Sequence, residues 1–168
     1  MTTEQTERIR AALRAAPTRM TLQLSRQLGV PEVEVIRAMR EGRAVELDAA
    51  RWEEILRALE EVGNVHVIVT NGAVTCETTG RFGGFSVWGE FFNVQSGSLD
   101  LHVRFKELTA AFAVEKPGHT DGVSTLRVQF YDRQGAAALK AFLSFGGAPP
   151  APERRRWFDD LRRRFAKG

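Results

Sequence analysis

The hydrophobic pattern of this chain changes its period once, near Gly63, and this change limits the folds open to it. Before Gly63, apolar residues recur every three or four positions, as in helices with one buried face. After it, apolar and polar residues alternate through a series of short segments, as in strands with one buried face. Because helices and strands occupy separate parts of the chain, the predicted class is α+β.

The part over residues 1–62 is predicted to be mainly helical. Gly29 and Pro31 mark the end of one helix and the start of the next, because glycine often ends a helix and proline suits its first turn. A further helix ends at Gly63. Its apolar stripe consists of Trp52, Ile55, Leu56 and Leu59.

Residues 63–146 are predicted to form a large antiparallel sheet as a meander, because successive strands follow one another through tight turns. Asn71-Gly72 suits the positive φ angles of a type I′ hairpin turn. The predicted strands cover 64–71, 73–80, 85–94, 98–105, 109–116 and 123–132. Residues 138–145 fit a strand or a short helix. An amphipathic helix over 151–166 closes a single domain of residues 1–168.

Composition excludes several classes of protein. No apolar run approaches the roughly 20 residues that span a bilayer, and the polar N-terminus lacks the apolar segment of a signal peptide. We therefore expect a cytoplasmic protein with no membrane insertion. The single cysteine, Cys76, excludes an internal disulfide. The net charge is +3, but the last sixteen residues alone carry +4, so the protein ends in a basic helix and is not broadly basic.

Residues 99–105 alternate cleanly and present a histidine on the non-core face. Asp100, His102 and Arg104 point one way, while the leucine, valine and phenylalanine side chains between them point the other. The chain contains no GxSxG, HExxH, GxxxxGK[ST] or strand-to-helix GxGxxG motif, so no catalytic residue is predicted. Three scattered histidines and one cysteine argue against a closed zinc site.

Haem requires less from a protein than zinc does, because the porphyrin itself fills four coordination positions of the iron. One axial histidine or tyrosine, an apolar slot and one or two cations for the propionates suffice. In this sequence His102 is the candidate iron ligand, and Arg104 or Arg127 are the candidate propionate partners. The candidate ring-packing groups are Phe85, Trp88, Phe91 and Phe92. The same aromatics also fit an ordinary core, and a lone strand histidine also fits an ordinary surface.

Nucleic-acid binding is a weaker interpretation. Residues 21–39 have the spacing of a helix-turn-helix, but the second helix begins with two glutamates, which would repel phosphates. The arginine-rich C-terminal helix would suit RNA or an acidic membrane. Asp159, Asp160 and the apolar residues Trp157, Leu161 and Phe165 favour a docked amphipathic helix instead.

Three stretches of this sequence resemble the ChuX/HutX haem-utilisation carriers. They are GNVHVIVTNGAVTCETTG, GEFFNVQSGSLDLHVRFKELTAAFAVEK and TLRVQFYDRQGAAALKAFLSFGG, and the likeness extends over roughly Leu22 to Phe165. HemS-type haem carriers contain the same unit twice. The resemblance implies a large antiparallel sheet flanked by helices, a homodimer, and a cytosolic protein that binds haem and passes it to a haem-degrading enzyme. The family's histidine falls on His102.

Two positions depart from the family pattern. Thr70 stands where some members have a second histidine, and His66 lies four residues earlier on the same strand face. Phe91 stands where others have a tyrosine, and phenylalanine cannot ligate iron. The only tyrosine, Tyr131, lies near a turn, and His119 lies in a predicted loop.

Three functional hypotheses follow. The first is a non-catalytic haem carrier that uses His102, Arg104, Arg127, Phe91, Trp88 and His66. The second is a haem-degrading or haem-modifying enzyme with an external reductant. The third is an interaction or nucleic-acid-binding module that has kept the fold without the ligand.

Overall fold

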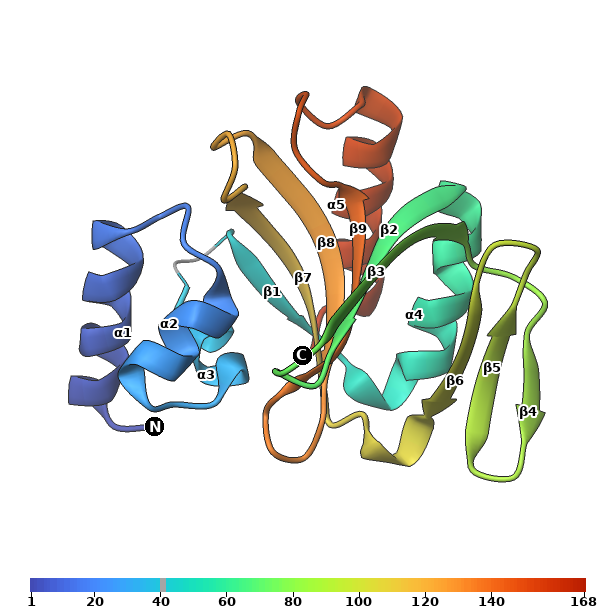
Figure 1. The fold of residues 1–168 in the computed structure, drawn as a ribbon, viewed down its shortest axis with the longest axis horizontal. Helices are drawn as coiled ribbons and strands as arrows, with labels where there is room; N and C mark the ends of the chain where they lie inside the picture. Colours follow the sequence, from blue (N-terminus) through green and yellow to red (C-terminus); the bar gives the residue numbers. More distant parts are fainter. Residues whose placement is uncertain (40–41) are drawn as a thin grey trace.

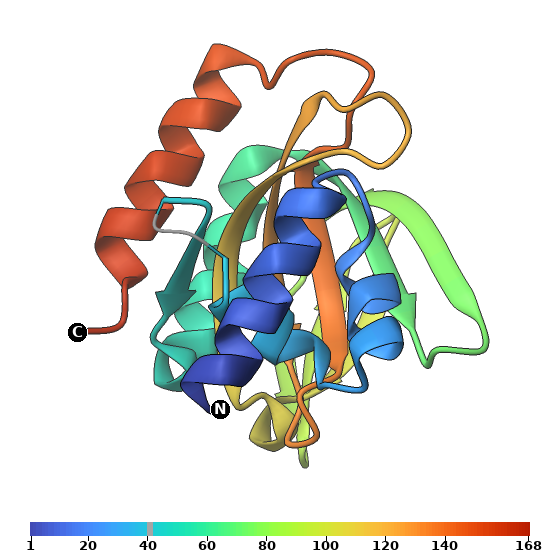
Figure 2. The same ribbon diagram turned by 90° about the vertical axis from the view of Figure 1, so that its left-hand side faces the viewer.

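The computed structural model describes residues 1–39 and 42–168. Three helices at the N-terminus, α1, α2 and α3, form a small group beside the sheet (Figure 1). They cover Thr3–Ala15, Thr21–Leu28 and Glu32–Arg37. As predicted, α2 ends at Gly29, whose φ of 65° is left-handed, and Pro31 caps the start of α3. Figure 2 shows these helices lying over one face of the sheet.

The main sheet has six strands in the order β1-β7-β8-β9-β2-β3, and every neighbouring pair is antiparallel. Its strands cover Ala44–Leu47 (β1), Asn64–Thr70 (β2), Thr75–Arg81 (β3), Ala110–Pro117 (β7), Ser124–Tyr131 (β8) and Ala137–Ser144 (β9). A second sheet has the order β4-β5-β6, with strands Ser86–Trp88, Phe91–Gln95 and Asp100–Arg104. The α+β class, with N-terminal helices, an antiparallel sheet and a C-terminal helix, is therefore confirmed.

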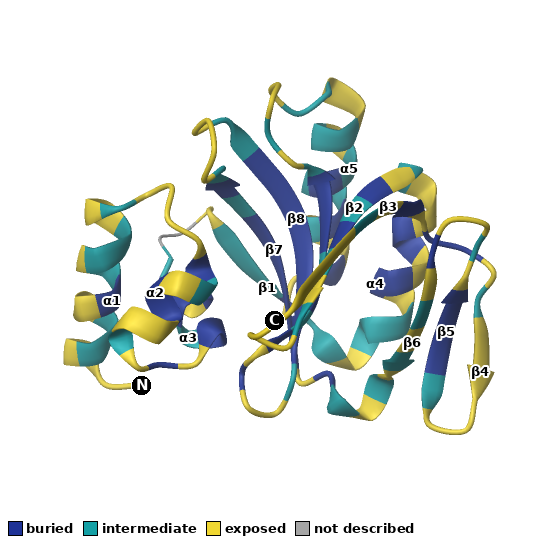
Figure 3. Cartoon of the chain, in the orientation of Figure 1, coloured by how far each residue is buried: buried dark blue, intermediate teal, exposed yellow. Residues whose placement is uncertain are grey.

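Two helices cover one face of the six-stranded sheet. They are α4, Trp52–Ala58, which continues into a short 3₁₀ turn that ends at Gly63, and α5, Pro152–Phe165. Short 3₁₀ turns also cover Ala49–Arg51 and Phe105–Glu107. The core between these helices and the sheet includes Ile55, Val67, Val128, Phe130, Phe158 and Leu161. Figure 3 shows that β7 and β8 are buried along most of their length. No helix of the described residues is both long and apolar enough to cross a membrane.

The opposite face of β8 is also buried, although its side chains are polar. Thr125, Arg127, Gln129 and Tyr131 alternate with the core residues of the same strand, and each is at most 7% exposed. The N-terminal helices cover part of this face. Glu32 at the start of α3 forms an ion pair with Lys140 of β9, with 2.6 Å between Oε1 and Nζ. The sheet therefore has an apolar core on one face and a buried polar layer on the other.

Two predicted details of the strands are wrong. Asn71 and Gly72 belong to a four-residue loop between the paired residues Thr70 and Thr75, not to a two-residue type I′ turn. The Asn71 carboxamide oxygen accepts the backbone N–H groups of Ala73 and Val74, which stabilises a wider loop. The single strand predicted over 85–94 is a hairpin.

Gly89 is the reason for that hairpin. Its φ of 58° reverses the chain so that Trp88 pairs with Phe91. Strand β1 is absent from the strands predicted from the sequence, because its four residues lie inside the predicted helical part. The ambiguous residues 138–145 fall largely in β9, which pairs with both β8 and β2.

Candidate functional site

A cavity of about 340 Å³, the sheet cavity, lies on the polar face of the six-stranded sheet. This volume falls within the range of small-molecule pockets. Its walls come from the segment before and within α2, the end of β7 and the loop between β7 and β8, and strands β2, β3, β8 and β9. The lining residues are Thr18, Met20, Thr21, Leu22, Ile68, Thr70, Thr75, Glu77, Lys116, Pro117, Gly118, His119, Thr120, Asp121, Thr125, Arg127, Lys140, Phe142 and Phe145. Arg26 of α2 also donates to the carbonyl of Gly72 in the β2–β3 loop.

Arg127 is a buried cation in the wall of this cavity. Its guanidinium donates to the side-chain oxygens of Gln129 (3.1 Å) and Thr125 (3.3 Å), which are both neutral. Its Cζ lies 5.2 Å from the centre of the Phe142 ring. Within residues 1–39 and 42–168, no ion pair involves Arg127. Burial lowers the pKa of Arg127, since a desolvated charge is costly.

Lys116 is a second buried cation in the same wall. It is 6% exposed, and its Nζ donates to the carbonyl of Pro117 at 3.1 Å. Burial, with a smaller contribution from Arg127, lowers the pKa of Lys116 to about 8. Lys140 also lines the cavity, but it is paired with Glu32. The cavity therefore holds two cations, Lys116 and Arg127, that have only neutral partners among the described residues.

The lowered pKa of Lys116 predicts a pH dependence of stability. Between about pH 8 and pH 10.5, Lys116 is deprotonated in the folded protein but still protonated in the unfolded chain. Because the unfolded state then binds more protons, stability rises with pH in this window. We expect the wild-type protein to gain on the order of 1 kcal/mol relative to Lys116→Met between pH 8 and pH 10.5, after allowance for solvent screening. Urea unfolding of both proteins at each pH measures this difference. A constant difference would contradict the lowered pKa.

His66 lies beside the cavity in the same row as Arg127. The register pairs His66 with Phe142, and Phe142 with Arg127, so the three side chains lie on one face of adjacent strands. The Nε2 of His66 is 2.9 Å from a Glu77 carboxylate oxygen, and the imidazole stacks on Phe145 with ring centres 3.9 Å apart. Its Nδ1 is 3.4 Å from the Thr79 hydroxyl. Both ring nitrogens are thus engaged.

Two further sequence positions line the cavity directly. Thr70, for which the family resemblance implies a histidine in some members, lines the cavity, and its hydroxyl donates to the carbonyl of Val74. His119 lies in the exposed loop after β7. Among the described residues, it is the one histidine that lines the cavity.

His102 lies on a different surface, the outer face of the small sheet. This face presents Ser86, Trp88, Phe91, Asn93, His102 and Arg104. The Nδ1 of His102 is 2.7 Å from the Asn93 side-chain oxygen, and the Asn93 amide nitrogen donates to Ser86. Because that oxygen only accepts, Nδ1 carries the proton and Nε2 is free to bind a metal. The His102 side chain is 55% exposed, with Nε2 3.5 Å from Asp100.

The predicted site residues therefore divide into two groups. His102, Arg104, Phe91 and Trp88 share the outer face, where the Arg104 Cζ lies 5.8 Å from the Phe91 ring centre and Trp88 is 77% exposed. Arg104 also pairs with Glu90 at 2.6 Å. Arg127 lines the sheet cavity, and His66 lies beside it in the same row of the sheet. In Figure 1, β6 and the N-terminal helices lie at opposite ends of the molecule, so one chain does not bring the two groups together.

Several lining residues were not predicted from the sequence, notably Lys116, Phe142 and Phe145. A signal for part of the site does exist in β8, where polar residues alternate with core residues. Lys116, near the end of β7, and Phe145, directly after β9, have no such signal in the sequence. Phe92, predicted as a ring-packing group, is fully buried in the core and stacks on Phe85.

The basic C-terminal helix is docked as predicted. Arg155 pairs with Glu115 of β7 at 2.8 Å, and Arg154 donates to the carbonyls of Leu143 and Asn64. These guanidinium groups are used within the chain, which weakens the interpretation of α5 as an RNA-binding surface. In the helix-turn-helix segment, Glu32 is 2% exposed against the sheet, so the start of its second helix is unavailable to a DNA groove.

Solved structures with the same fold have low sequence identity to this chain. A protein from Agrobacterium tumefaciens is 22% identical with a TM-score of 0.84, and the match covers 96% of this chain and 92% of that one. The haem-binding protein ChuX is 20% identical with a TM-score of 0.81 and coverage of 93% and 97%. Haem-loaded PhuS from Pseudomonas aeruginosa is 22% identical with a TM-score of 0.73, and this chain covers 46% of it.

No functionally curated protein matches the chain significantly by sequence. A family model does match, and it describes the haemin-degrading HemS.ChuX domain. The match extends over residues 29–164, which is most of the chain and includes strands β1 to β9. The protein therefore belongs to the HemS/ChuX family of haem-binding and haem-utilisation proteins.

Proposed function

We propose that this protein is a cytoplasmic haem carrier that holds haem, or a related tetrapyrrole, in the sheet cavity and passes it to a haem-degrading enzyme. The observation that carries the proposal is the pair of buried cations, Arg127 and Lys116, beside the aromatic wall of Phe142 and Phe145. Haem is complementary to this arrangement, because it has an apolar ring and two carboxylates at one edge. ChuX and PhuS, which share the fold, are haem-binding proteins.

The residues of the cavity suit such a ligand. Arg127 and Lys116 have no acidic partner among the described residues, so a propionate would supply the missing negative charge. The amide nitrogen of Gln129, which donates to no partner among the described residues, lies buried in the same polar layer. Phe142 and Phe145 meet edge to face at 4.8 Å and offer an apolar surface for the ring.

The iron ligand in this proposal is His102 of a second copy of the chain. His102 is oriented by Asn93 with Nε2 free, but in its own chain it lies on a different surface from the cavity. A homodimer would allow the outer face of one protomer to cover the sheet cavity of the other. His102 would then ligate the iron, Arg104 would reach a propionate, and Trp88 and Phe91 would pack on the ring. His119 is the alternative ligand within the chain.

Titration with ferric haem, followed by the Soret band, tests this function. Arg127→Gln should weaken haem binding by at least about tenfold, because it removes a charge-assisted hydrogen bond from a buried site. Arg163→Gln, an exposed residue of α5, is the matched control and should bind haem like wild type. Circular dichroism and urea unfolding verify that each variant is folded. A folded Arg127→Gln with unchanged affinity would exclude the sheet cavity as the haem site.

Hybrid dimers test the origin of the ligand. His102→Ala should shift the Soret band and lower affinity, and added imidazole should restore the spectrum. A hybrid of one His102→Ala chain and one Arg127→Gln chain would contain one intact site if His102 acts across the dimer, so half of the normal sites should bind haem tightly. If His102 acts within its own chain, the hybrid has no intact site. If only His119→Ala shifts the Soret band, the iron ligand is His119 in the loop after β7 and not His102.

An enzymatic role is the second candidate, and the match to one half of ChuS, a haem oxygenase of Escherichia coli, favours it. The distinguishing measurement is the fate of bound haem with ascorbate as the reductant. Loss of the Soret band together with release of iron would indicate degradation. A stable spectrum, followed by transfer to added apo-haem-degrading enzyme, is the result expected for a carrier.

A further inference from the structure

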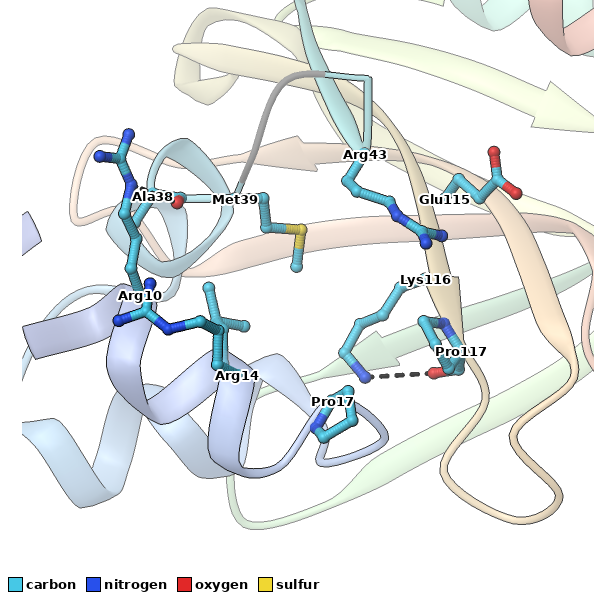
Figure 4. A pocket seen from close by; sticks show the side chains of 10 residues that line it. Arg10, Arg14, Pro17, Ala38, Met39, Arg43, Glu115, Lys116 and Pro117 are labelled. Carbon is cyan, nitrogen blue, oxygen red and sulfur yellow. Dashed lines mark hydrogen bonds between the residues drawn. The ribbon is translucent and has the colours of Figure 1, made fainter. Parts of the chain in front are cut away.

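A second cavity of about 450 Å³, the helix cavity, lies between α1 and strand β7 (Figure 4). Its charged residues are mostly cationic. Arg10 and Arg14 come from α1, while Arg43 and Lys116 come from the opposite wall, near β1 and in β7. Figure 4 shows the two arginines of α1 on one side of the cavity and Arg43 and Lys116 on the other. The functional assignment above leaves three of these cations, Arg10, Arg14 and Arg43, unused.

Among the described residues, few acidic groups compensate these charges. Glu115 is the single acidic residue of residues 1–39 and 42–168 that lines the cavity, and both of its carboxylate oxygens accept from Arg155 of α5. Arg10 is paired with Glu7 at 2.9 Å. In the part of the chain that the structure describes, no ion pair involves Arg14 or Arg43. Among the described lining residues, positive charges therefore outnumber negative ones, which would attract an anion.

The rest of the lining is apolar. Leu13, Pro17, Ala38, Met39 and Pro117 form the surface between the two cationic walls. Methionine adapts its shape to different apolar ligands. A cavity with an apolar surface and cationic walls suits a molecule that has an apolar body and an oxyanion head, because guanidinium groups bind carboxylates and phosphates in a bidentate manner.

We propose that the helix cavity binds an amphiphilic carboxylate, with its head between Arg14 and Arg43 and its apolar body against Leu13 and Met39. This site is separate from the haem site and does not depend on it, although Lys116 and Pro117 belong to the walls of both cavities. Occupation of the helix cavity would draw Lys116 towards the bound head. A carboxylate in one cavity would then change the affinity for an anionic ligand in the other.

Calorimetric titration of the full chain with decanoate, decanol, acetate and inorganic phosphate tests this proposal. Decanoate should bind at least tenfold more tightly than any of the other three, because it alone combines the charge with an apolar body. Equal binding of decanol would show that charge is irrelevant and would overturn the proposal. If phosphate or acetate bound as tightly as decanoate, the apolar surface would contribute nothing to binding, and the proposal would also fail.

Variants then locate the site. Arg14→Gln combined with Arg43→Gln should weaken decanoate binding at least tenfold and leave haem binding unchanged, since both side chains lie outside the sheet cavity. Arg127→Gln should have the opposite pattern. Both arginines of the first variant are exposed, so folding should persist. If only Arg127→Gln weakens decanoate binding, the ligand occupies the sheet cavity and the proposal fails, whether or not haem binds.

Discussion

Gly84→Ala is expected to lower the free energy of unfolding by about 4 kcal/mol, the sum of backbone strain and a steric clash. Gly84 has a φ of +59°, and a Cβ at this position would lie 2.0 Å from the carbonyl oxygen of Gln95. The segment at Gly83 and Gly84 packs directly against the last residue of β5, because the Gln95 N–H also donates to the carbonyl of Gly83 at 3.0 Å. Relief of the clash would require the small sheet to move away from the preceding segment.

Gly89→Ala is the matched control for this prediction. Gly89 has a φ of +58°, but nothing lies within 4 Å of the position of a Cβ. Gly89→Ala should therefore lower the free energy of unfolding only by the left-handed backbone strain, about 1 kcal/mol. Urea unfolding followed by tryptophan fluorescence measures both variants, because Trp52 packs in the core against Phe105. Equal losses of stability in the two variants would show that the close approach at Gly84 is unimportant.

Glu32→Gln is expected to destabilise the protein by about 3 kcal/mol, because it leaves a buried cation without its partner. Glu32 is 2% exposed, accepts from the Thr21 hydroxyl at 2.5 Å, and lies 2.6 Å from Lys140. This ion pair joins α3 to β9 across 108 residues of sequence. It is therefore a main link between the N-terminal helices and the polar face of the sheet.

A double-mutant cycle with Lys140→Met isolates the pair. Each single variant leaves one buried charge unpaired, whereas the double variant removes both charges. We expect the double variant to be more stable than either single variant, with a coupling free energy of about 2 kcal/mol. Additive losses in urea unfolding would mean that Glu32 and Lys140 stabilise the protein independently. Haem titration of the double variant would also show whether the helices must be held in this position to form the cavity.

The sequence predicts best those structural features that depend only on neighbouring residues. The alternation around His102 predicted its exposed position correctly, because the direction of a side chain in a strand depends only on its neighbours. The end of α2 at Gly29 was equally predictable from one left-handed residue. The division of residues 85–94 into a hairpin was not predicted, because an apolar and aromatic run hides a turn that depends on Gly89 alone.

The candidate site was less predictable than the fold. Arg127 was predicted as a propionate partner in one group with His102, but the structure places these two residues on different surfaces. A sequence pattern shows which residues share a strand face and does not show which strands meet. Strand β9 lies between β8 and β2, and this order alone places Arg127, Phe142 and His66 in one row.

The sequence by itself determined the α+β class, the succession of a helical part, a strand-rich part and a closing helix, and the outward direction of His102, because each follows from hydrophobic period and turn residues. Only the tertiary structure decided where the cavities lie. Their walls combine residues from Arg10 to Phe145, and such surfaces form through long-range packing that no local pattern encodes. The same packing buries Lys116 and Arg127 beside neutral partners, and it thereby turns two ordinary strand residues into candidate anion-binding groups.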